Sequence, residues 1–194
     1  MRYAWRIVAA GCLLSAPASA DVLTYVAAWP ESSPADWTHV LELPLFDPSY
    51  GILQSVDLQV HATFRGRWQY ENTGGVPGLW IQQRTWSQLV TDVSTGTQLF
   101  YLEPDMWVSE GTVGAFDGVV DYAGTSGVTV DYLAPDEIEQ IALGDIASFI
   151  GTGTRSFLVS NTSFFSIMVS PANYYFWSRS WSSSELTITY NYVP

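Results

Sequence analysis

Indole, guanidinium and amide side chains alternate in residues 79–90, LWIQQRTWSQLV. Trp80, Arg84 and Trp86 share one parity with two glutamines, and a strand displays residues of one parity on one face. Exposed indoles beside polar groups suit stacking on sugar rings, and they are equally common at protein contacts. Eight tryptophans follow residue 20, more than one core is expected to hold. We therefore predict an exposed ligand-binding face formed by Trp80, Arg84 and Trp86.

Acidic side chains form a second candidate site in a glycine-rich region. Asp117, Asp121 and Asp131 lie there, and Asp136 and Glu137 follow. Calcium takes several oxygen ligands from a bent backbone, which makes the three aspartates candidate calcium ligands. Their spacing matches neither an EF-hand nor a glycine–aspartate repeat. Turn and capping roles explain the same residues, so both alternatives stay open.

Hydrolytic chemistry has few candidate residues. The two histidines, His39 and His61, fall on neighbouring predicted strands, where they could share a metal or be ordinary surface residues. A G-x-S-x-G nucleophile motif does not occur. Paired carboxylates, as in jelly-roll glycosidases, are the remaining enzymatic option. The candidates on or beside predicted strands are Glu42, Asp57, Asp105, Glu110 and Glu185. No spacing brings two of them together, and we expect no enzyme.

The charge balance is strongly acidic. All nineteen acidic residues and only five of the seven arginines follow residue 20, giving that part a net charge of −14, and the chain has no lysine. Such a surface repels nucleic acid and anionic lipid headgroups. Divalent cations, cationic partners and uncharged glycans remain possible partners, while acidity also keeps an exported β-protein soluble.

The first twenty residues have the pattern of a signal peptide. Arg2 and Arg6 precede a short apolar run, and small residues end at Ala20, so we expect cleavage after Ala20. A lipoprotein site at Cys12 is the alternative, although the residues before this cysteine fit it loosely. Cys12 is the only cysteine, so the mature chain has no disulfide. No later stretch is predicted to form a membrane helix. We expect one secreted or cell-surface domain, residues 21–194.

The clearest structural pattern is an alternation that follows a turn. After Asp47, Pro48 and Gly51, apolar residues take every second position through residue 64. A period of two over this length predicts a long strand with one dry and one wet face. We expect this strand to be central. The core residues predicted on its dry face are Val56, Leu58 and Val60.

Eight to ten such strands are separated by turns. Proline, glycine and acidic residues at its ends predict one short helix over residues 135–143. The expected fold is therefore all-β, an antiparallel β-sandwich or jelly roll with one short helix.

Residues 46–51, FDPSYG, followed by Leu53, Ser55 and Val56, resemble the opening phrase of the choice-of-anchor E domain family. The glycine-rich phrases at 121–127 and 150–154 fit the same likeness. The resemblance implies a β-rich bacterial surface or matrix domain with varied C-terminal anchors and no catalytic residues. The sequence stops at Pro194, about where such a tail would begin, so we expect either a released protein or a gene product that continues beyond Pro194.

We expect a non-catalytic extracellular structural or adhesive domain, monomeric or weakly associating and folding without metal. A carbohydrate-binding module of the jelly-roll type is the alternative, and a glycosidase is third. The expected partners are a polysaccharide or a surface protein. An exposed tryptophan row without facing carboxylates favours carbohydrate binding, whereas a cleft with two carboxyl groups about 5–10 Å apart favours the glycosidase.

Overall fold

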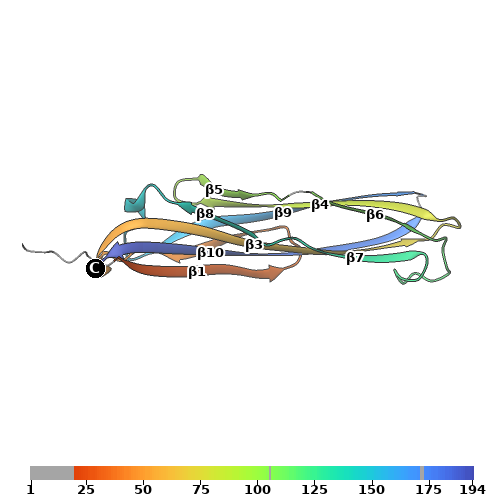
Figure 1. Ribbon diagram of the computed structural model, residues 1–194, viewed down its shortest axis with the longest axis horizontal. Coiled ribbons are helices and arrows are strands. Elements are labelled where there is room, and N and C mark those ends of the chain that lie inside the picture. Colours follow the sequence, from red (N-terminus) through yellow and green to blue (C-terminus); the bar gives the residue numbers. More distant parts are fainter. Residues whose placement is uncertain (1–19, 105, 171–172) are drawn as a thin grey trace, which may run out of the picture.

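The computed structural model describes residues 20–104, 106–170 and 173–194 as two antiparallel β-sheets that run along an elongated molecule (Figure 1). Sheet A contains β1 (Asp21–Ser32), β10 (Tyr174–Val193), β3 (Ile52–Asn72), β7 (Gly127–Leu133) and β8 (Glu137–Ala142). Sheet B contains β2 (Trp37–Pro44), β9 (Thr154–Ser170), β4 (Gly78–Asp92), β5 (Thr97–Leu102) and β6 (Trp107–Val113). Two short 3-10 helices are η1 (Pro48–Tyr50) and η2 (Ile146–Phe149).

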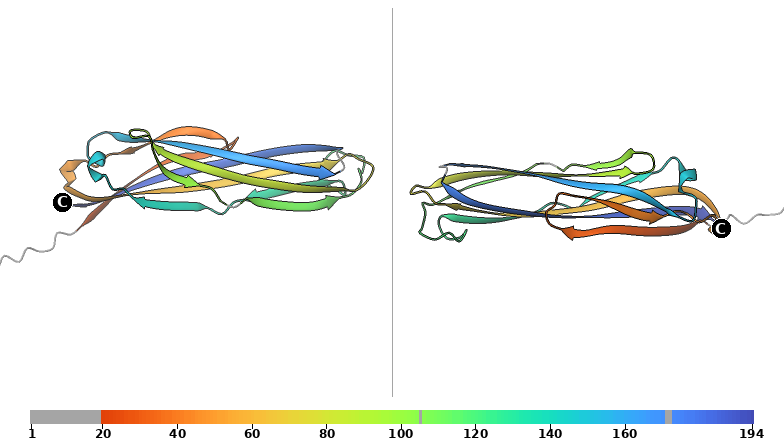
Figure 2. Two further views of the ribbon diagram at one scale, coloured as in Figure 1. Left: turned by 90° about the horizontal axis from the view of Figure 1, so that it is seen from above. Right: turned by 180° about the vertical axis from the view of Figure 1, so that it is seen from behind.

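The strand order is that of a jelly roll. β7 and β8 pair with different halves of β3, and β6 and β5 pair with different ends of β4. If each of these two pairs is counted as one interrupted strand, the sheets read 1-8-3-6 and 2-7-4-5 in eight strands. The predicted all-β sandwich of the jelly-roll type is therefore confirmed. The strands of both sheets twist along the molecule (Figure 2).

The long alternating strand is β3, and its predicted register is correct. Val56, Leu58 and Val60 are completely buried in the larger of two hydrophobic clusters. β3 pairs with β10 along its whole length, and β7 and β8 cover its other edge. It is therefore an interior strand, which lets it anchor sheet A from one end to the other.

The helix expected over residues 135–143 is wrong, because this segment contains strand β8. Residues 137–142 pair with residues 57–62 of β3, whose backbone N–H and C=O groups would otherwise lack partners on that side. Pairing with β3 outweighs the weak local preference set by Pro135 and Gly144. Among the described residues, no helix is long and apolar enough to cross a membrane.

A buried ion pair closes one end of the sandwich. The carboxylate of Asp92, at the end of β4, accepts hydrogen bonds from Arg155 and from the amide and hydroxyl of Ser94. Arg155 also donates to the carbonyl of Ser148 and lies over the ring of Phe149, at 4.1 Å from its centroid. Burial alone would raise the pKa of Asp92. The hydrogen bonds from Arg155 and Ser94 have the larger combined effect, so the pKa lies below its ordinary value of 3.8.

We predict that the free energy of unfolding falls less steeply with decreasing pH in Asp92→Asn than in the parent protein. Folding lowers the pKa of Asp92, so the ionised carboxylate stabilises the folded state. This contribution is complete above the ordinary pKa and is lost as the pH falls through the folded-state pKa. Chemical denaturation between about pH 5 and pH 2 should show a shallower fall for Asp92→Asn than for the parent. The same steep fall in both proteins would contradict this role.

We predict that Leu58→Asp prevents folding. The leucine is fully buried, and an unpaired carboxylate in its place costs at least several kcal/mol. The neighbouring Gln59 lies on the outer face of the same strand, so Gln59→Asp is the matched control and should melt cooperatively. Circular dichroism melting of both variants is the measurement, and a parent-like transition for Leu58→Asp would disprove the register.

Candidate functional site

The predicted binding face on β4 is wrong, because its residues point into the interior. Trp80, Arg84 and Trp86 are only 6%, 2% and 1% exposed. Trp86 stacks on Phe64 of β3 with ring centroids 5.8 Å apart, and Trp80 meets Trp68 edge-on at 4.7 Å. Both rings fill space between the sheets, so they cannot contact a ligand.

The prediction of an exposed face rested on the polar residues that share the parity of Trp80 and Trp86, among them Gln88. Gln88 is buried; its amide nitrogen donates to the hydroxyl of Ser184 on the opposite sheet at 2.7 Å, and its amide oxygen has no partner among the described residues. The apolar residues of the other parity, including Leu79 and Ile81, instead lie on the outer face of sheet B. Parity was correct, but the assignment of wet and dry faces was inverted, because Trp80 and Trp86 pack on rings of the opposite sheet and the glutamines beside them are buried with them.

Exposed indole and guanidinium groups gather instead on the outer face of sheet A. We call this surface the arginine–tryptophan face. It consists of Arg65, Arg67 and Gln69 on β3 and of Trp177, Arg179 and Trp181 on β10. The register places Trp181 opposite Arg65, Arg179 opposite Arg67 and Trp177 opposite Gln69, so all six share one surface. Three of the five arginines after residue 20 therefore lie together.

Ion pairs hold two of these arginines. Arg65 makes two 2.6 Å hydrogen bonds to Glu31, and Arg67 binds both carboxylate oxygens of Asp131 at 2.6 and 2.9 Å. The hydrogen bond from Arg65 lowers the pKa of Glu31, and the one from Arg67 lowers the pKa of Asp131. Both carboxylates therefore stay ionised at neutral pH, and each pair is electrically neutral overall.

Aromatic and amide groups complete the face. The guanidinium of Arg65 lies over the ring of Trp181, 4.3 Å from its centroid, and that of Arg179 lies at 5.3 Å. Trp177 is 39% exposed at the outer edge of the sheet, and Gln69 opposite it donates to the hydroxyl of Thr129 at 3.0 Å. The two tryptophans are four positions apart, which sets them about 13 Å apart along the strand.

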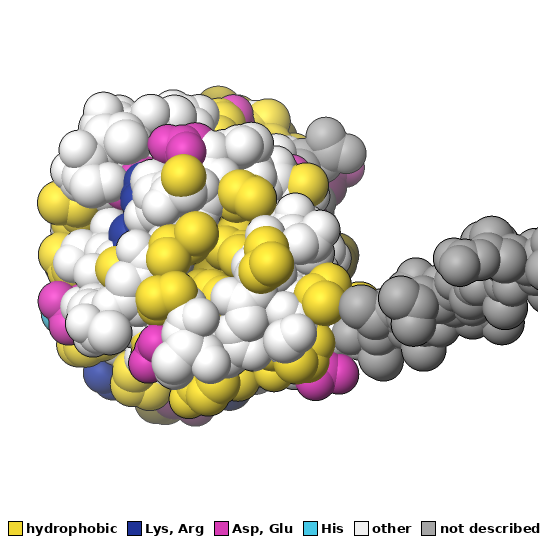
Figure 3. Space-filling model, turned by 90° about the vertical axis from the view of Figure 1, so that its left-hand side faces the viewer, with side chains coloured by type: hydrophobic (Ala, Val, Ile, Leu, Met, Phe, Trp, Pro, Cys, Tyr) yellow, Lys and Arg dark blue, Asp and Glu magenta, His cyan; other side chains and the backbone are white. Residues whose placement is uncertain are grey.

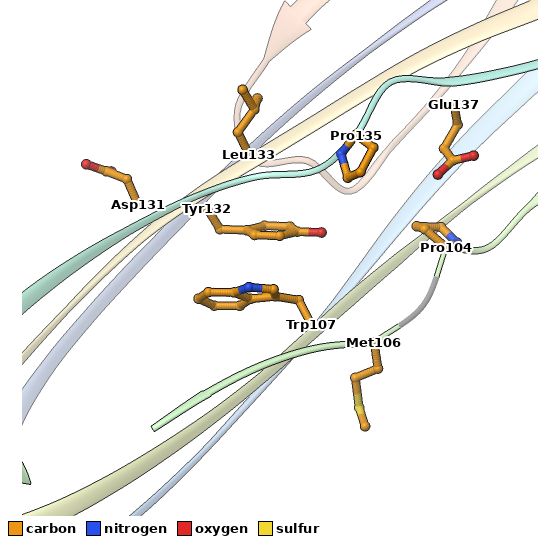
Figure 4. Close-up of a pocket in the computed structure, with 8 residues that line it drawn as sticks. All are labelled: Pro104, Met106, Trp107, Asp131, Tyr132, Leu133, Pro135 and Glu137. Carbon is orange, nitrogen blue, oxygen red and sulfur yellow. The ribbon is translucent and has the colours of Figure 1, made fainter. Parts of the chain in front are cut away.

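Two hollows adjoin this face around the end of β7. A hollow of about 270 Å³ lies beside Arg65, Arg67 and Trp181. Beyond Asp131 and Leu133, a cleft of about 810 Å³ opens where the β5–β6 and β7–β8 strands are interrupted. The cleft is lined by Pro104, Met106, Trp107, Asp131, Tyr132, Leu133, Pro135 and Glu137 (Figure 4).

A stacked aromatic pair forms the wall of this cleft. The rings of Trp107 on β6 and Tyr132 on β7 lie 4.7 Å apart with an angle of 30° between their planes (Figure 4). Burial raises the pKa of Tyr132, so its hydroxyl stays protonated at neutral pH. The pair joins the edges of the two sheets and presents apolar surface to the cleft.

The three predicted calcium ligands do not converge. Asp117 accepts from the backbone amide of Val119, Asp121 accepts from that of Ala123, and Asp131 binds Arg67. These are the turn and ion-pair roles that compete with metal binding. Within the described residues, no group of three or more metal-binding side chains occurs.

The glycine-rich segment that carries Asp117 and Asp121 is held to the end of β3 by other residues. Glu71 is buried and accepts from the amide of Tyr122 at 2.7 Å and from the hydroxyl of Ser126 at 2.5 Å. The amide of Asn72 donates to the carbonyls of Val76 and Gly114, both at 2.8 Å. These contacts give the segment a structural role.

The histidines and carboxylates considered for catalysis are dispersed. His39 lies in sheet B, where it stacks on Trp29, whereas His61 lies on the outer face of sheet A, 3.3 Å from Asp136, so the two cannot share a metal. Of the carboxylates, Glu42 and Glu110 lie on the outer face of sheet B and Asp57 and Glu185 on that of sheet A. Asp105 lies outside the described residues.

Apolar side chains also gather at the end of the molecule where β3 begins and β10 finishes (Figure 3). Tyr50, Ile52 and Ile150 are exposed there. The rest of this end is mostly uncharged, and carboxylates lie toward its rim (Figure 3). It offers no converging polar groups, so the arginine–tryptophan face is the better candidate site.

The site residues on β10 had a signal in the sequence. Residues 173–181, NYYFWSRSW, are rich in aromatic side chains, and residues 177–181 alternate tryptophan and arginine with serine, a pattern that predicts a strand. The pairing of β10 with β3 decides the rest. It places Arg65 and Arg67 beside Trp177, Arg179 and Trp181, all of which face outward. Those strands are more than one hundred residues apart in sequence.

Comparisons with known proteins give no family. No family model matches the chain, and no curated protein matches it. Solved structures with a similar arrangement include a viral protein of infectious bursal disease virus, Gx strain, at 11% identity and a TM-score of 0.24, covering 91% of this chain and 38% of that one. A chain of Desmodium yellow mottle tymovirus has 10% identity, a TM-score of 0.23 and coverages of 97% and 96%. Similarity at this level carries no functional argument.

We predict that Trp86→Ala strongly destabilises the domain while Trp177→Ala does not. Removing a fully buried indole costs about 3–5 kcal/mol, because the cavity left beside Phe64 cannot collapse. Removing the half-exposed Trp177 should cost about 1 kcal/mol or less. Urea denaturation of both variants is the test, and similar losses of unfolding free energy would contradict the assignment of inner and outer faces.

Proposed function

We propose that this chain is a non-catalytic, exported adhesive domain that holds an extended, uncharged polysaccharide on its arginine–tryptophan face. The observation that carries the proposal is the clustering of Trp177, Trp181 and three arginines on one outer face. In this proposal residues 1–20 are removed as a signal peptide. β1 then begins at the first residue of the mature chain, Asp21.

The chemistry of the face supports a sugar ligand. An exposed indole offers an apolar ring face on which a pyranose can stack. Around Trp177, the amide of Gln69, the hydroxyl of Thr129 and the guanidinium of Arg179 supply donors and acceptors that can bond sugar hydroxyls. The spacing of Trp177 and Trp181 suits a chain of several sugar units rather than one ring.

Charge favours an uncharged polymer over a polyanion. Glu31 and Asp131 already neutralise Arg65 and Arg67, which leaves Arg179 as the unneutralised cation of the face among the described residues. The mature chain as a whole carries −14, so it repels polyanions at long range. The paired guanidinium and carboxylate groups instead act as fixed donors and acceptors.

A surface protein is the second candidate partner, because tryptophan and arginine are also enriched in protein-contact hot spots. The glycosidase alternative would require two carboxyl groups at working separation beside the bound sugar. The carboxylates nearest the face, Glu31 and Asp131, are each bound by an arginine, a state that suits binding rather than acid–base chemistry.

We predict that Trp177→Ala weakens polysaccharide binding by about tenfold or more, since losing ~1.4 kcal/mol of contact corresponds to a factor of ten. Affinity electrophoresis against a β-glucan, a mannan and a galactan, with alginate as the acidic comparison, measures the retardation. Binding should change little between low and high salt, and no reducing sugar should be released.

Phe164→Ala is the matched control, because Phe164 is an exposed aromatic on the outer face of sheet B. It should retain full binding. Equal retardation of the parent and Trp177→Ala, or binding only to alginate with strong salt dependence, would overturn the proposal. Loss of binding in both variants would show that the sugar contact does not lie on this face.

A further inference from the structure

Arg84 is a buried cation, and no carboxylate of the described residues forms an ion pair with it. Its side chain lies between the sheets, and one terminal nitrogen, Nη2, donates to the hydroxyl of Ser178 at 3.0 Å. Its guanidinium also lies 5.1 Å from the ring centroid of Phe165. The ion pairs within the described residues involve His61, Arg65, Arg67 and Arg155 but not Arg84.

The protein makes specific room for this side chain. A Cβ built on Gly66 of β3 would lie 1.3 Å from Nη1 of Arg84, so only glycine leaves space for the guanidinium at that position. The two remaining donor groups, Nε and Nη1, are buried and have no acceptor among the described residues. A buried N–H without a partner costs about 1–3 kcal/mol, and more when it is charged.

Arg84 nevertheless keeps its charge at neutral pH. Burial lowers its pKa to about 10, and this value is still well above 7. A charged group in such a place requires either a counter-ion or several hydrogen bonds. The side chains that line the space beside the guanidinium are hydroxyls and phenylalanine rings, and Asp36, which is bonded to Ser163 there, forms no ion pair with Arg84.

A small cavity beside the guanidinium has the size of one monatomic ion. Its volume is about 20 Å³, above the roughly 10–15 Å³ that a single water requires, and it is too small for a carboxylate or a sulfate. It is lined by Phe64, Arg84, Ser163, Phe164, Phe165, Ser178 and Ser180, and it opens toward solvent beside the exposed Ser178 and Phe164. Since the Ser178 oxygen accepts from Arg84, its own hydrogen is free to donate, and the Ser180 hydroxyl can donate as well.

We propose that this cavity binds one halide-sized monovalent anion, chloride in physiological solution, as the internal counter-ion of Arg84. The cavity is lined by hydroxyl donors, by one positive charge and by phenylalanine side chains; the carboxylate of Asp36 is bonded to the lining residue Ser163 but does not itself line the cavity. A halide accepts hydrogen bonds from all directions and is little larger than water. It can therefore neutralise the charge of Arg84 and accept from the N–H and O–H groups that line the cavity. A water molecule would satisfy only the donors.

Two measurements on the mature domain test the site together. Crystals soaked in sodium bromide should show an anomalous peak within hydrogen-bonding distance of Arg84 and Ser180. The melting temperature should rise by a few degrees and saturate as chloride replaces gluconate at constant ionic strength, because the anion binds only the folded state.

Arg84→Met, which keeps the length of the side chain but removes its charge, should abolish the chloride dependence. Arg179→Met removes an exposed arginine and should keep it. The bromide experiment uses the unaltered protein, so it decides the question even if Arg84→Met does not fold. A bromide peak without a chloride-dependent melting temperature would mean an adventitious ion only. Absence of the peak, with or without a melting response, would overturn the proposal.

Discussion

Backbone pairing along β3 is the constraint on which the rest of the molecule depends. The strand bonds to β10 over its full length on one edge and to β7 and then β8 on the other. Because side chains alternate strictly, this register fixes the dry face with Leu58 and the wet face with Arg65 at the same time. The core and the candidate site are therefore two faces of one strand, and a one-residue slip would destroy both.

The interior between the sheets is unusual in composition. Tryptophans 68, 80 and 86 are buried together with Arg84 and Gln88, so the space is filled by large rings and by polar groups that need partners. Serines on the opposing sheet supply some of these partners, and Gly66 supplies the room for the guanidinium. Such an interior favours one register, because a shifted strand would break the hydrogen bonds from Arg84 to Ser178 and from Gln88 to Ser184.

Periodicity in the sequence was sufficient for the fold class and for the register of β3, because those depend on local alternation. It failed where long-range pairing decides the outcome. β8 forms because the edge of β3 needs a partner, and Trp80 and Trp86 point inward because they pack on Trp68 and Phe64 of the opposite sheet. The site itself joins residues 65–69 to residues 177–181, a proximity that no local pattern encodes.

The placement of the five arginines after residue 20 shows how this acidic chain uses its cations. Four of them lie over an aromatic ring, namely Arg65, Arg84, Arg155 and Arg179. The fifth, Arg67, donates two parallel hydrogen bonds to the carboxylate of Asp131. Stacking and forked bonding both require a planar guanidinium, and the compact ammonium of lysine supports neither. The arginines thus serve as flat, directional groups more than as sources of positive potential. On the outer face of sheet A this makes recognition depend on ring stacking and fixed hydrogen bonds, the two interactions that an uncharged sugar polymer can satisfy.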